Sequence, residues 1–304
     1  MSCLDPRIAY QAGNNENGKK NVRFAPIRFE WSINEYRKRY GDSLFLMPCG
    51  KCLGCQLDKA RDWSIRCVLE SQYHTESCFV TLTFDDAHYP VAASRTTLRD
   101  LFVGFIESLR NDGVKCRYFG CCERGSITKR IHAHIIIFGF KPDDMEFYKV
   151  GSNGDYLYNS AYLSSKWQKG FVVVGDMSYQ SAGYVARYTM KKLDDDSSFI
   201  FMSNRPGIGF QYCKDHAEKI IESDCVYGQF GNLHTAPVPR YFNRFLSEWY
   251  PEQYARLQLA RIRNISLHDN NALINYKKVH LEQLKIEQEK ALNKKAALLK
   301  RGNV

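Results

Sequence analysis

The sequence predicts an α+β fold in which an antiparallel sheet has its helices packed on one face. A cysteine-containing arm precedes this core and a helix follows it. Three patterns predict the class: strands with alternating polar and apolar residues, a strongly amphipathic helix between two of them, and a C-terminal segment rich in Lys and Glu. We expect residues 1–77 to form an arm that contains a cysteine cluster and a basic helix, and residues 78–195 to form the core. An extension over 196–250 and a basic helical tail over 251–304 follow.

The arm shows little regular structure. Its first 45 or so residues mix Asn, Gly, Lys and Arg without clear periodicity, which predicts few helices or strands. After a cysteine cluster, residues 58–73 have the spacing of a helix with one apolar and one basic side. On that helix Arg61, Trp63 and Arg66 are candidates for contacting phosphate and stacking on an unpaired base, and they fit ordinary surface and core positions equally well.

The core begins with a strand and a helix. Residues 78–84 are β-branched or aromatic with a polar residue at every second position, which indicates a strand whose two faces differ. A helix then follows, with Thr96 or Thr97 as its N-cap and Asp112-Gly113 at its end. Its apolar residues recur at helical spacing: Leu98, Leu101, Phe102, Phe105, Ile106 and Leu109.

The remaining core elements complete a recognisable series. Strands are predicted over 115–122 and 131–140, followed by a short helix over 160–168 and an apolar strand over 171–174. A further helix over 178–192 opens with a serine cap. The order β-α-β-β-α-β plus one helix predicts a ferredoxin-like antiparallel sheet.

Charge and hydropathy limit the class of protein. The 304 residues include 43 Lys and Arg against 33 Asp and Glu, a formal net charge of +10, which favours a nucleic acid partner, although a merely soluble basic protein has the same balance. No stretch approaches the roughly 20 apolar residues of a membrane helix. Eleven cysteines, an odd number, and a start unlike a signal peptide lead us to expect a reducing cytoplasm.

A pair of histidines is the first candidate site. His132 and His134 lie within a predicted strand, so both imidazoles project from the same face and together can bind a divalent metal. Histidines at this spacing also occur as hydrogen-bonded residues on half-buried sheets. Glu123 ends the preceding strand, and a hairpin loop of about eight residues lays it opposite the pair, if the register is right. Such a mixed site suits Mg²⁺ or Mn²⁺, which polarises a phosphate.

Two tyrosines on the last core helix are the second candidate. Tyr184 and Tyr188 are one turn apart and share a helix face, and a phenol becomes a nucleophile where a metal or cation stabilises its developing charge. Lys191, one turn further on, is suited to that role or to binding phosphate. Arg187 and Lys192 are further candidates for DNA contacts. Tyrosines at this spacing also serve as packing residues.

These motifs, in this order, resemble those of the HUH endonucleases, named for His-hydrophobe-His, that initiate rolling-circle DNA replication. Residues 79–84 look like the first motif of the family, 132–134 like the second and 184–191 like the third. Segments 47–55, 202–209 and 239–242 further resemble replication initiators of the gokushovirus group of Microviridae, small single-stranded DNA bacteriophages, over most of residues 1–245.

The resemblance implies a function and a role for each residue. His132 and His134 would bind the metal with Glu123 as the acidic ligand, and Tyr184 and Tyr188 would be paired nucleophiles that nick DNA through a 5′-phosphotyrosine and later rejoin it. It implies single-stranded or supercoiled origin DNA as substrate, with a host helicase and DNA polymerase as partners in the cytoplasm of an infected bacterium. The alternatives are an HUH transposase or relaxase, and a zinc-stabilised DNA-binding protein without catalysis.

A cysteine cluster precedes the core. Cys49, Cys52 and Cys55 have the spacing of metal ligands, with Cys3, Cys67 or Cys78 as the possible fourth, so a structural Zn²⁺ is one interpretation. Reduced cysteines on a Gly-rich loop are the other. The tail from about 274 to 301 favours a long, exposed, basic helix that binds DNA, binds a partner or is simply solvated.

Overall fold

The chain divides into two compact units. One comprises residues 1–58 with 280–297, and the other residues 59–279 with 298–304. The structure is a computed structural model, and it describes residues 3–4, 6–14, 20–26, 33–41, 44–125, 129–151, 154–187, 198–261, 286 and 289–294. Within these residues no helix is both long and apolar enough to cross a membrane.

The first unit contains a small antiparallel sheet. Its strands are β1 (Arg7–Asn14), β2 (Lys20–Phe24) and β3 (Leu44–Met47), in the order β2-β1-β3, and helix α1 (Ile33–Tyr40) connects β2 to β3. The prediction of an arm with few elements was therefore wrong. Periodicity missed these strands because what holds them is pairing between residues far apart in sequence, such as Arg7 with Met47.

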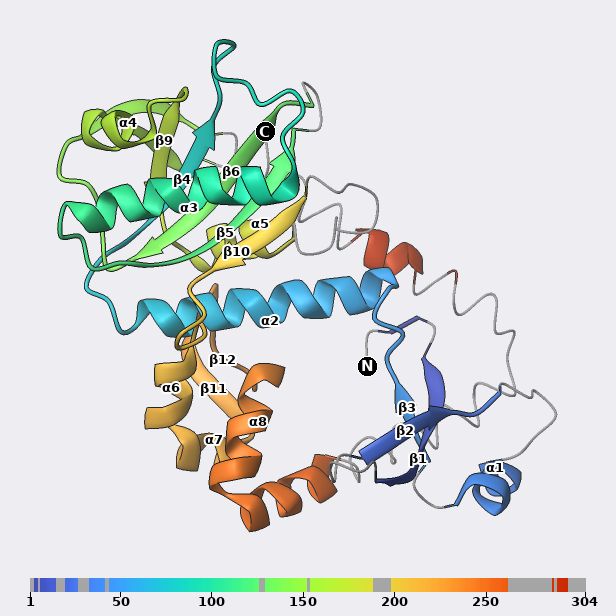
Figure 1. Cartoon of the computed structure of the whole chain (residues 1–304). Coiled ribbons are helices and arrows are strands. Elements are labelled where there is room, and N and C mark those ends of the chain that lie inside the picture. Colours follow the sequence, from blue (N-terminus) through green and yellow to red (C-terminus); the bar gives the residue numbers. More distant parts are fainter. Residues whose placement is uncertain are drawn as a thin grey trace. The chain divides into compact units, whose positions relative to one another are not determined.

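The second unit is built around a seven-stranded sheet in which every neighbouring pair is antiparallel (Figure 1). The order is β10-β5-β6-β4-β9-β8-β7. The strands are β4 (Ser77–Thr83), β5 (Arg117–Arg124), β6 (Ile131–Phe138), β7 (Met145–Val150), β8 (Tyr156–Ser160), β9 (Val172–Asp176) and β10 (Phe199–Met202). The predicted α+β class with an antiparallel sheet is confirmed, and β7, β8 and β10 are additions to it.

Helices cover both faces of this sheet, which corrects the prediction that they pack on one face. On one face α3 (Arg95–Asn111) and α4 (Ala161–Trp167) pack against alternate residues of β4 and β6, such as Val80 and Ile135. On the other face α2 (Leu53–Ser71) and α5 (Tyr179–Arg187) pack against Ile136 and its neighbours. The physical reason is that β5 and β6 are buried almost continuously, so both of their faces need an apolar cover.

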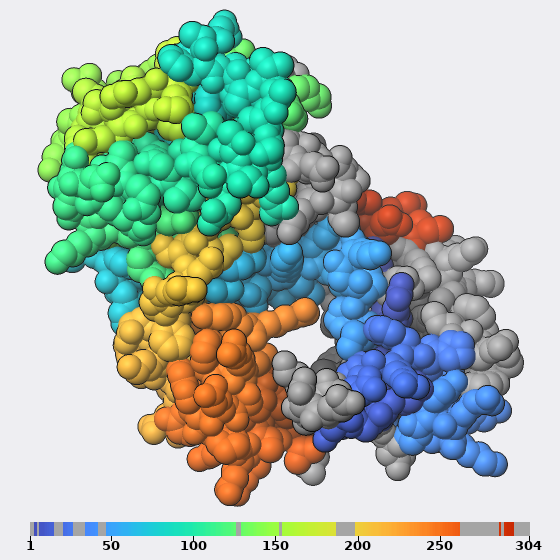
Figure 2. All heavy atoms as spheres, in the orientation of Figure 1, coloured from blue at the N-terminus to red at the C-terminus, as the bar shows by residue number. Residues whose placement is uncertain are grey.

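Two helices begin at other residues than the sequence predicted. The N-cap of α3 is Ser94, whose hydroxyl accepts a hydrogen bond from the Thr97 backbone N–H at 3.1 Å, so the predicted caps Thr96 and Thr97 lie inside the helix. Helix α2 begins at Leu53 rather than 58 and so includes Cys55. The outer side of α3 forms part of the surface of this unit (Figure 2).

The extension forms a layer of its own around a third group of apolar residues. It contains α6 (Phe210–Asp215), α7 (Ala217–Ser223), the hairpin β11 (Cys225–Phe230) and β12 (Leu233–Pro237), and α8 (Arg240–Trp249). Tyr212, Phe242 and Leu246 pack there against Ile65 and Leu69 of α2. Strand β10, at the start of the extension, instead joins the core sheet beside β5. The predicted tail helix falls mostly outside the described residues. Within the tail, residues 289–294 are described and are helical.

Candidate active site

Three side chains on neighbouring strands form the centre of the site. His132 and His134 project from one face of β6, and Glu123 lies directly opposite His132 on β5. The β5–β6 register therefore places Glu123 on the same face as the two histidines, as the predicted site required. Glu123 is 3% exposed and His134 6%, while His132 is half-buried, so the cluster opens to solvent on the His132 side.

The donor atoms of these residues converge. Oε1 of Glu123 lies 3.0 Å from Nε2 of His132 and 3.4 Å from Nε2 of His134. One ligand atom from each residue lies within 4.8 Å of the other two. A carboxylate oxygen and two imidazole nitrogens can therefore reach a common ion with only small side-chain adjustments.

Two groups behind the imidazoles can accept hydrogen bonds from them. Nδ1 of His132 lies 3.2 Å from the carbonyl oxygen of Arg130, which can only accept, so Nδ1 carries the hydrogen in the tautomer that leaves Nε2 free to bind a metal. Nδ1 of His134 lies 2.9 Å from the hydroxyl of Thr81, which is able to accept in the same way. In neutral rings with these tautomers both Nε2 lone pairs face Glu123. In metal sites, too, a hydrogen bond from the second ring nitrogen orients each histidine ligand.

The chemistry of this donor set fits a divalent metal. Mixed nitrogen and oxygen ligands suit several divalent ions, and three protein ligands leave coordination positions for a phosphate oxygen and water. The fit does not by itself select one ion. Of the described residues, only this cluster and a group of four cysteines bring three or more metal-binding side chains together.

Tyr184 reaches the same cluster from the helix above it. Its hydroxyl lies 3.3 Å from Nε2 of His134, and its ring meets that imidazole edge-on with centroids 4.8 Å apart. Helix α5 holds it there because Ala182, Val185 and Ala186 pack on the sheet. The helix begins after Ser178, whose hydroxyl accepts a hydrogen bond from the Ser181 N–H.

Other predicted residues of this helix cannot be placed. Tyr188, Lys191 and Lys192 lie outside the described residues, and so does the side chain of Arg187. Their predicted roles therefore stay predictions.

On the basic helix, Arg66 has a core position, one of the two alternatives that the sequence left open. It is only 6% exposed, and its guanidinium stacks between the rings of Trp63 and Tyr241 at 3.9 and 4.0 Å. Its Nε also donates to the carbonyl of Ile208, so these interior partners occupy the group that phosphate would need. Trp63 stacks on Phe119 as well, whereas Arg61 is exposed.

Sequence reasoning missed two supporting residues on β4. Phe79 stacks on His134 with centroids 5.5 Å apart, and Thr81 is the direct cross-strand partner of His134. Their alternation in the strand was visible in the sequence. That they share a face with the histidines depends on the pairing of β4 with β6, which no local pattern reveals.

The cysteine cluster gains its fourth member from the N-terminus. Cys3 lies with Cys49, Cys52 and Cys55, and their sulfur atoms are all within 4.8 Å of one another. The other two candidates are excluded because Cys67 and Cys78 are fully buried elsewhere, in the apolar layers of the seven-stranded sheet.

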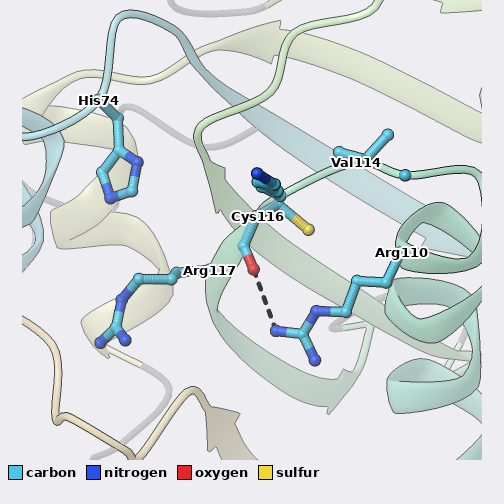
Figure 3. A pocket seen from close by; sticks show the side chains of 7 residues that line it. His74, Arg110, Val114, Cys116 and Arg117 are labelled. Atoms are coloured by element: carbon cyan, nitrogen blue, oxygen red, sulfur yellow. Dashed lines mark hydrogen bonds between the residues drawn. The ribbon is translucent and has the colours of Figure 1, made fainter.

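A separate pocket of about 590 Å³ lies at the other end of β5 (Figure 3). Arg117, which begins β5, and Arg110 are among its lining residues. Both are already engaged, Arg117 with the carboxylate of Glu70 and Arg110 with the carbonyl of Cys116 at 3.0 Å. Because Glu123 is near the opposite end of the strand, this pocket is no part of the candidate site.

The chain is similar in sequence to replication-associated proteins of bacteriophages. The family described as "Replication-associated protein ORF2" matches residues 77–193, which include Glu123, both histidines and Tyr184. Replication-associated protein VP4 of Bdellovibrio phage phiMH2K is 32% identical, over 69% of this chain and 70% of its own length. Replication-associated protein ORF2 of Spiroplasma virus 4 is 31% identical, over 84% of this chain and 83% of its own length.

A further relative, replication-associated protein ORF4 of Chlamydia phage 1, is 31% identical over 51% of this chain and 41% of its own length. No solved structure is a significant match. The two longer matches cover more than two thirds of each relative, and the three motifs predicted from the sequence fall within the residues that the family model matches. The chain belongs to the family of replication-associated proteins of small, gokushovirus-type bacteriophages.

Proposed function

We propose that this chain starts rolling-circle replication by nicking one DNA strand with a tyrosine and later rejoining it. The observation that carries the proposal is the position of the Tyr184 hydroxyl, 3.3 Å from Nε2 of His134 and so beside the Glu123–His132–His134 cluster. A nucleophile next to a metal-binding cluster is the arrangement that phosphodiester transfer requires.

The cluster is proposed to hold Mg²⁺ or Mn²⁺ through Glu123, His132 and His134. When bound, such an ion polarises the scissile phosphate and stabilises the charge that develops on it. Burial of Glu123 and His134 keeps competing water from their donor atoms, while the partly exposed His132 side leaves an approach for the DNA strand.

In the proposed step the Tyr184 oxygen attacks phosphorus, the Oη–P bond forms and the P–O3′ bond breaks. The phenol loses one proton and the departing 3′-oxygen gains one, so no net proton is consumed. The product is a 5′-phosphotyrosine with a free 3′-hydroxyl that a host polymerase can extend. Because the ester linkage is exchanged rather than hydrolysed, rejoining requires no ATP.

The second tyrosine of the proposal is Tyr188, one helical turn after Tyr184. With one tyrosine carrying DNA, the other would cleave the regenerated origin while the free 3′-hydroxyl attacks the first linkage. Lys191 is proposed to stabilise charge on a phenol or phosphate, and Arg61, Arg187 and Lys192 to contact the DNA backbone. The net charge of +10 supports a polyanionic substrate. The proposed substrate is origin DNA in the cytoplasm of an infected bacterium, where a host helicase would open the duplex.

The test uses single-stranded oligonucleotides that cover the phage origin, labelled at the 3′ end, with Mn²⁺. The expected product is a protein–DNA adduct that survives denaturation, reduced in Tyr184→Phe and in Tyr188→Phe and absent from the double variant. Tyr179→Phe is the matched control, because Tyr179 is on the same helix but packs against Phe230. Full adduct yield from the double variant would exclude both tyrosines, and no adduct from the unaltered chain would indicate binding without catalysis.

A further inference from the structure

The four clustered cysteines belong to the first unit and come from three separate segments. Cys3 precedes β1, Cys49 and Cys52 lie between β3 and α2, and Cys55 is in the first turn of α2. Antiparallel pairing of Arg7 with Met47 brings the start of β1 and the end of β3 to one end of the small sheet. The sheet topology is therefore what assembles the cluster.

The sulfur positions match a tetrahedral metal site. Sγ of Cys52 lies 3.8 Å from Sγ of Cys3, and Sγ of Cys49 lies 4.0 Å from Sγ of Cys55. A zinc ion with Zn–S bonds of about 2.3 Å holds its sulfur ligands about 3.8 Å apart. A disulfide would need sulfur atoms at about 2.05 Å. The spacing fits four ligands around one ion.

Backbone amides surround these sulfur atoms. The N–H of Cys49 donates to Sγ of Cys3 at 3.2 Å, the N–H of Cys52 to Sγ of Cys49 at 3.3 Å, and the N–H of Leu4 to Sγ of Cys52 at 3.3 Å. Hydrogen bonds of this kind orient the sulfur atoms, as the groups around a metal site orient its ligands. Gly50, at φ +75°, allows the tight turn that directs the Cys52 N–H back to Cys49.

The described residues of the first unit include few buried apolar side chains. Among the residues whose burial is described, those before Asp58 that are both buried and hydrophobic are only Ala9, Ala25 and Tyr36. None of its described residues belongs to the three large apolar clusters of the chain. Small units of this kind are commonly stabilised by a metal or by disulfides.

We propose that Cys3, Cys49, Cys52 and Cys55 bind one structural Zn²⁺ ion that stabilises the first unit. Four thiolates close the coordination sphere, so this ion has no position for a substrate. Its role differs from that of the ion at Glu123, His132 and His134, and it does not depend on the proposed nicking reaction. The zinc joins the start of β1 to the β3–α2 connection, in place of a larger core.

The first experiment measures zinc and iron by mass spectrometry in the full chain, purified without chelators. About one zinc per chain is expected. Cys52→Ser should lose it, whereas the double variant His132→Ala/His134→Ala should keep it, which shows which cluster holds the ion. Cys225→Ser is the control, because Cys225 is partly exposed and lies outside the cluster. Stoichiometric iron instead of zinc, or full zinc in Cys52→Ser, would overturn the assignment.

A second measurement covers the case in which Cys52→Ser does not fold. The unaltered chain is treated with a strong zinc chelator and digested briefly with protease. Cleavage should increase within residues 1–58 and return to its original level when Zn²⁺, but not Mg²⁺, is added back. Unchanged cleavage after confirmed zinc removal would show that the ion does not stabilise this unit.

Discussion

Glu123 and His132 are direct partners across the β5–β6 pair, and Oε1 of the carboxylate lies 3.0 Å from Nε2 of the imidazole. In the neutral tautomer whose Nδ1 donates to the carbonyl of Arg130, Nε2 is an acceptor that faces another acceptor. Two acceptors held this close attract a cation between them. The strand register therefore brings together two groups that can hold a metal ion between them.

Glu123→Gln tests this relationship. The amide keeps the size of the side chain but loses its charge, so affinity for Mn²⁺ should fall by at least the roughly 10- to 100-fold seen when supporting groups of metal sites are removed. Isothermal titration with Mn²⁺ measures the change. Glu76→Gln is the control, because Glu76 precedes β4 and lies outside the cluster. Unchanged Mn²⁺ affinity would remove Glu123 from the ligand set.

Thr81→Val tests the support behind His134. The isosteric change removes the hydroxyl that lies 2.9 Å from Nδ1, so the imidazole loses its preferred orientation. Adduct formation should fall about 10-fold or more while the fold is kept. Thr83→Val is the matched control, since the Thr83 hydroxyl donates to the Phe171 carbonyl instead. Equal losses in both variants would show that the hydroxyl of Thr81 has no special role.

The ionised carboxylate of Glu70 should stabilise the fold, and this contribution should be lost at acid pH. Burial raises the pKa of its carboxyl. Hydrogen bonds from His74, the Gly209 N–H and Arg117 lower that pKa by more than burial raises it, so the net pKa is below the ordinary value. The stabilisation is thus complete above the unfolded-state pKa of about 4.3 and is lost as the pH falls through the lower folded-state value. Glu70→Gln should therefore destabilise the protein at neutral pH and much less in acid.

The expected loss for Glu70→Gln near neutral pH is about 1.5–3 kcal/mol, the range for hydrogen bonds to charged groups. Urea denaturation measures it at several pH values. Glu107→Gln serves as the comparison: Glu107 is half exposed and pairs with Arg110 on the surface, so its loss should be below about 1 kcal/mol. A Glu70→Gln effect that stays constant down to low pH would contradict the assignment.

Arg66→Lys should affect stability rather than DNA binding. An ammonium group cannot stack between Trp63 and Tyr241 as the planar guanidinium does, and we expect a loss of about 2 kcal/mol. Thermal denaturation measures this loss, and the salt dependence of oligonucleotide binding should not change. The exposed Arg61→Lys should leave the melting temperature unaltered. Weaker oligonucleotide binding by Arg66→Lys at an unchanged melting temperature would restore Arg66 as a phosphate contact.

Local patterns in the sequence predicted much of the fold and the centre of the site. Alternation identified β4, helical spacing identified α3, and the period of two along β6 placed His132 and His134 on one face. These features depend only on near neighbours in the chain, because each element exposes its residues with a fixed period. The sequence also put forward Glu123 opposite the pair as a hypothesis, and the pairing of β5 with β6 supplies the register that it needed.

Only the tertiary structure decided which elements meet. The pairing of β4 with β6 brings Thr81 to His134, the pairing of β1 with β3 brings Cys3 to the other cysteines, and Tyr241 buries Arg66 from a distant helix. A residue's own neighbourhood in sequence determines its face, but its partners depend on which apolar surfaces are buried together. That is why the sequence alone determined the three motifs and their order, while the supports around them came from packing between distant segments.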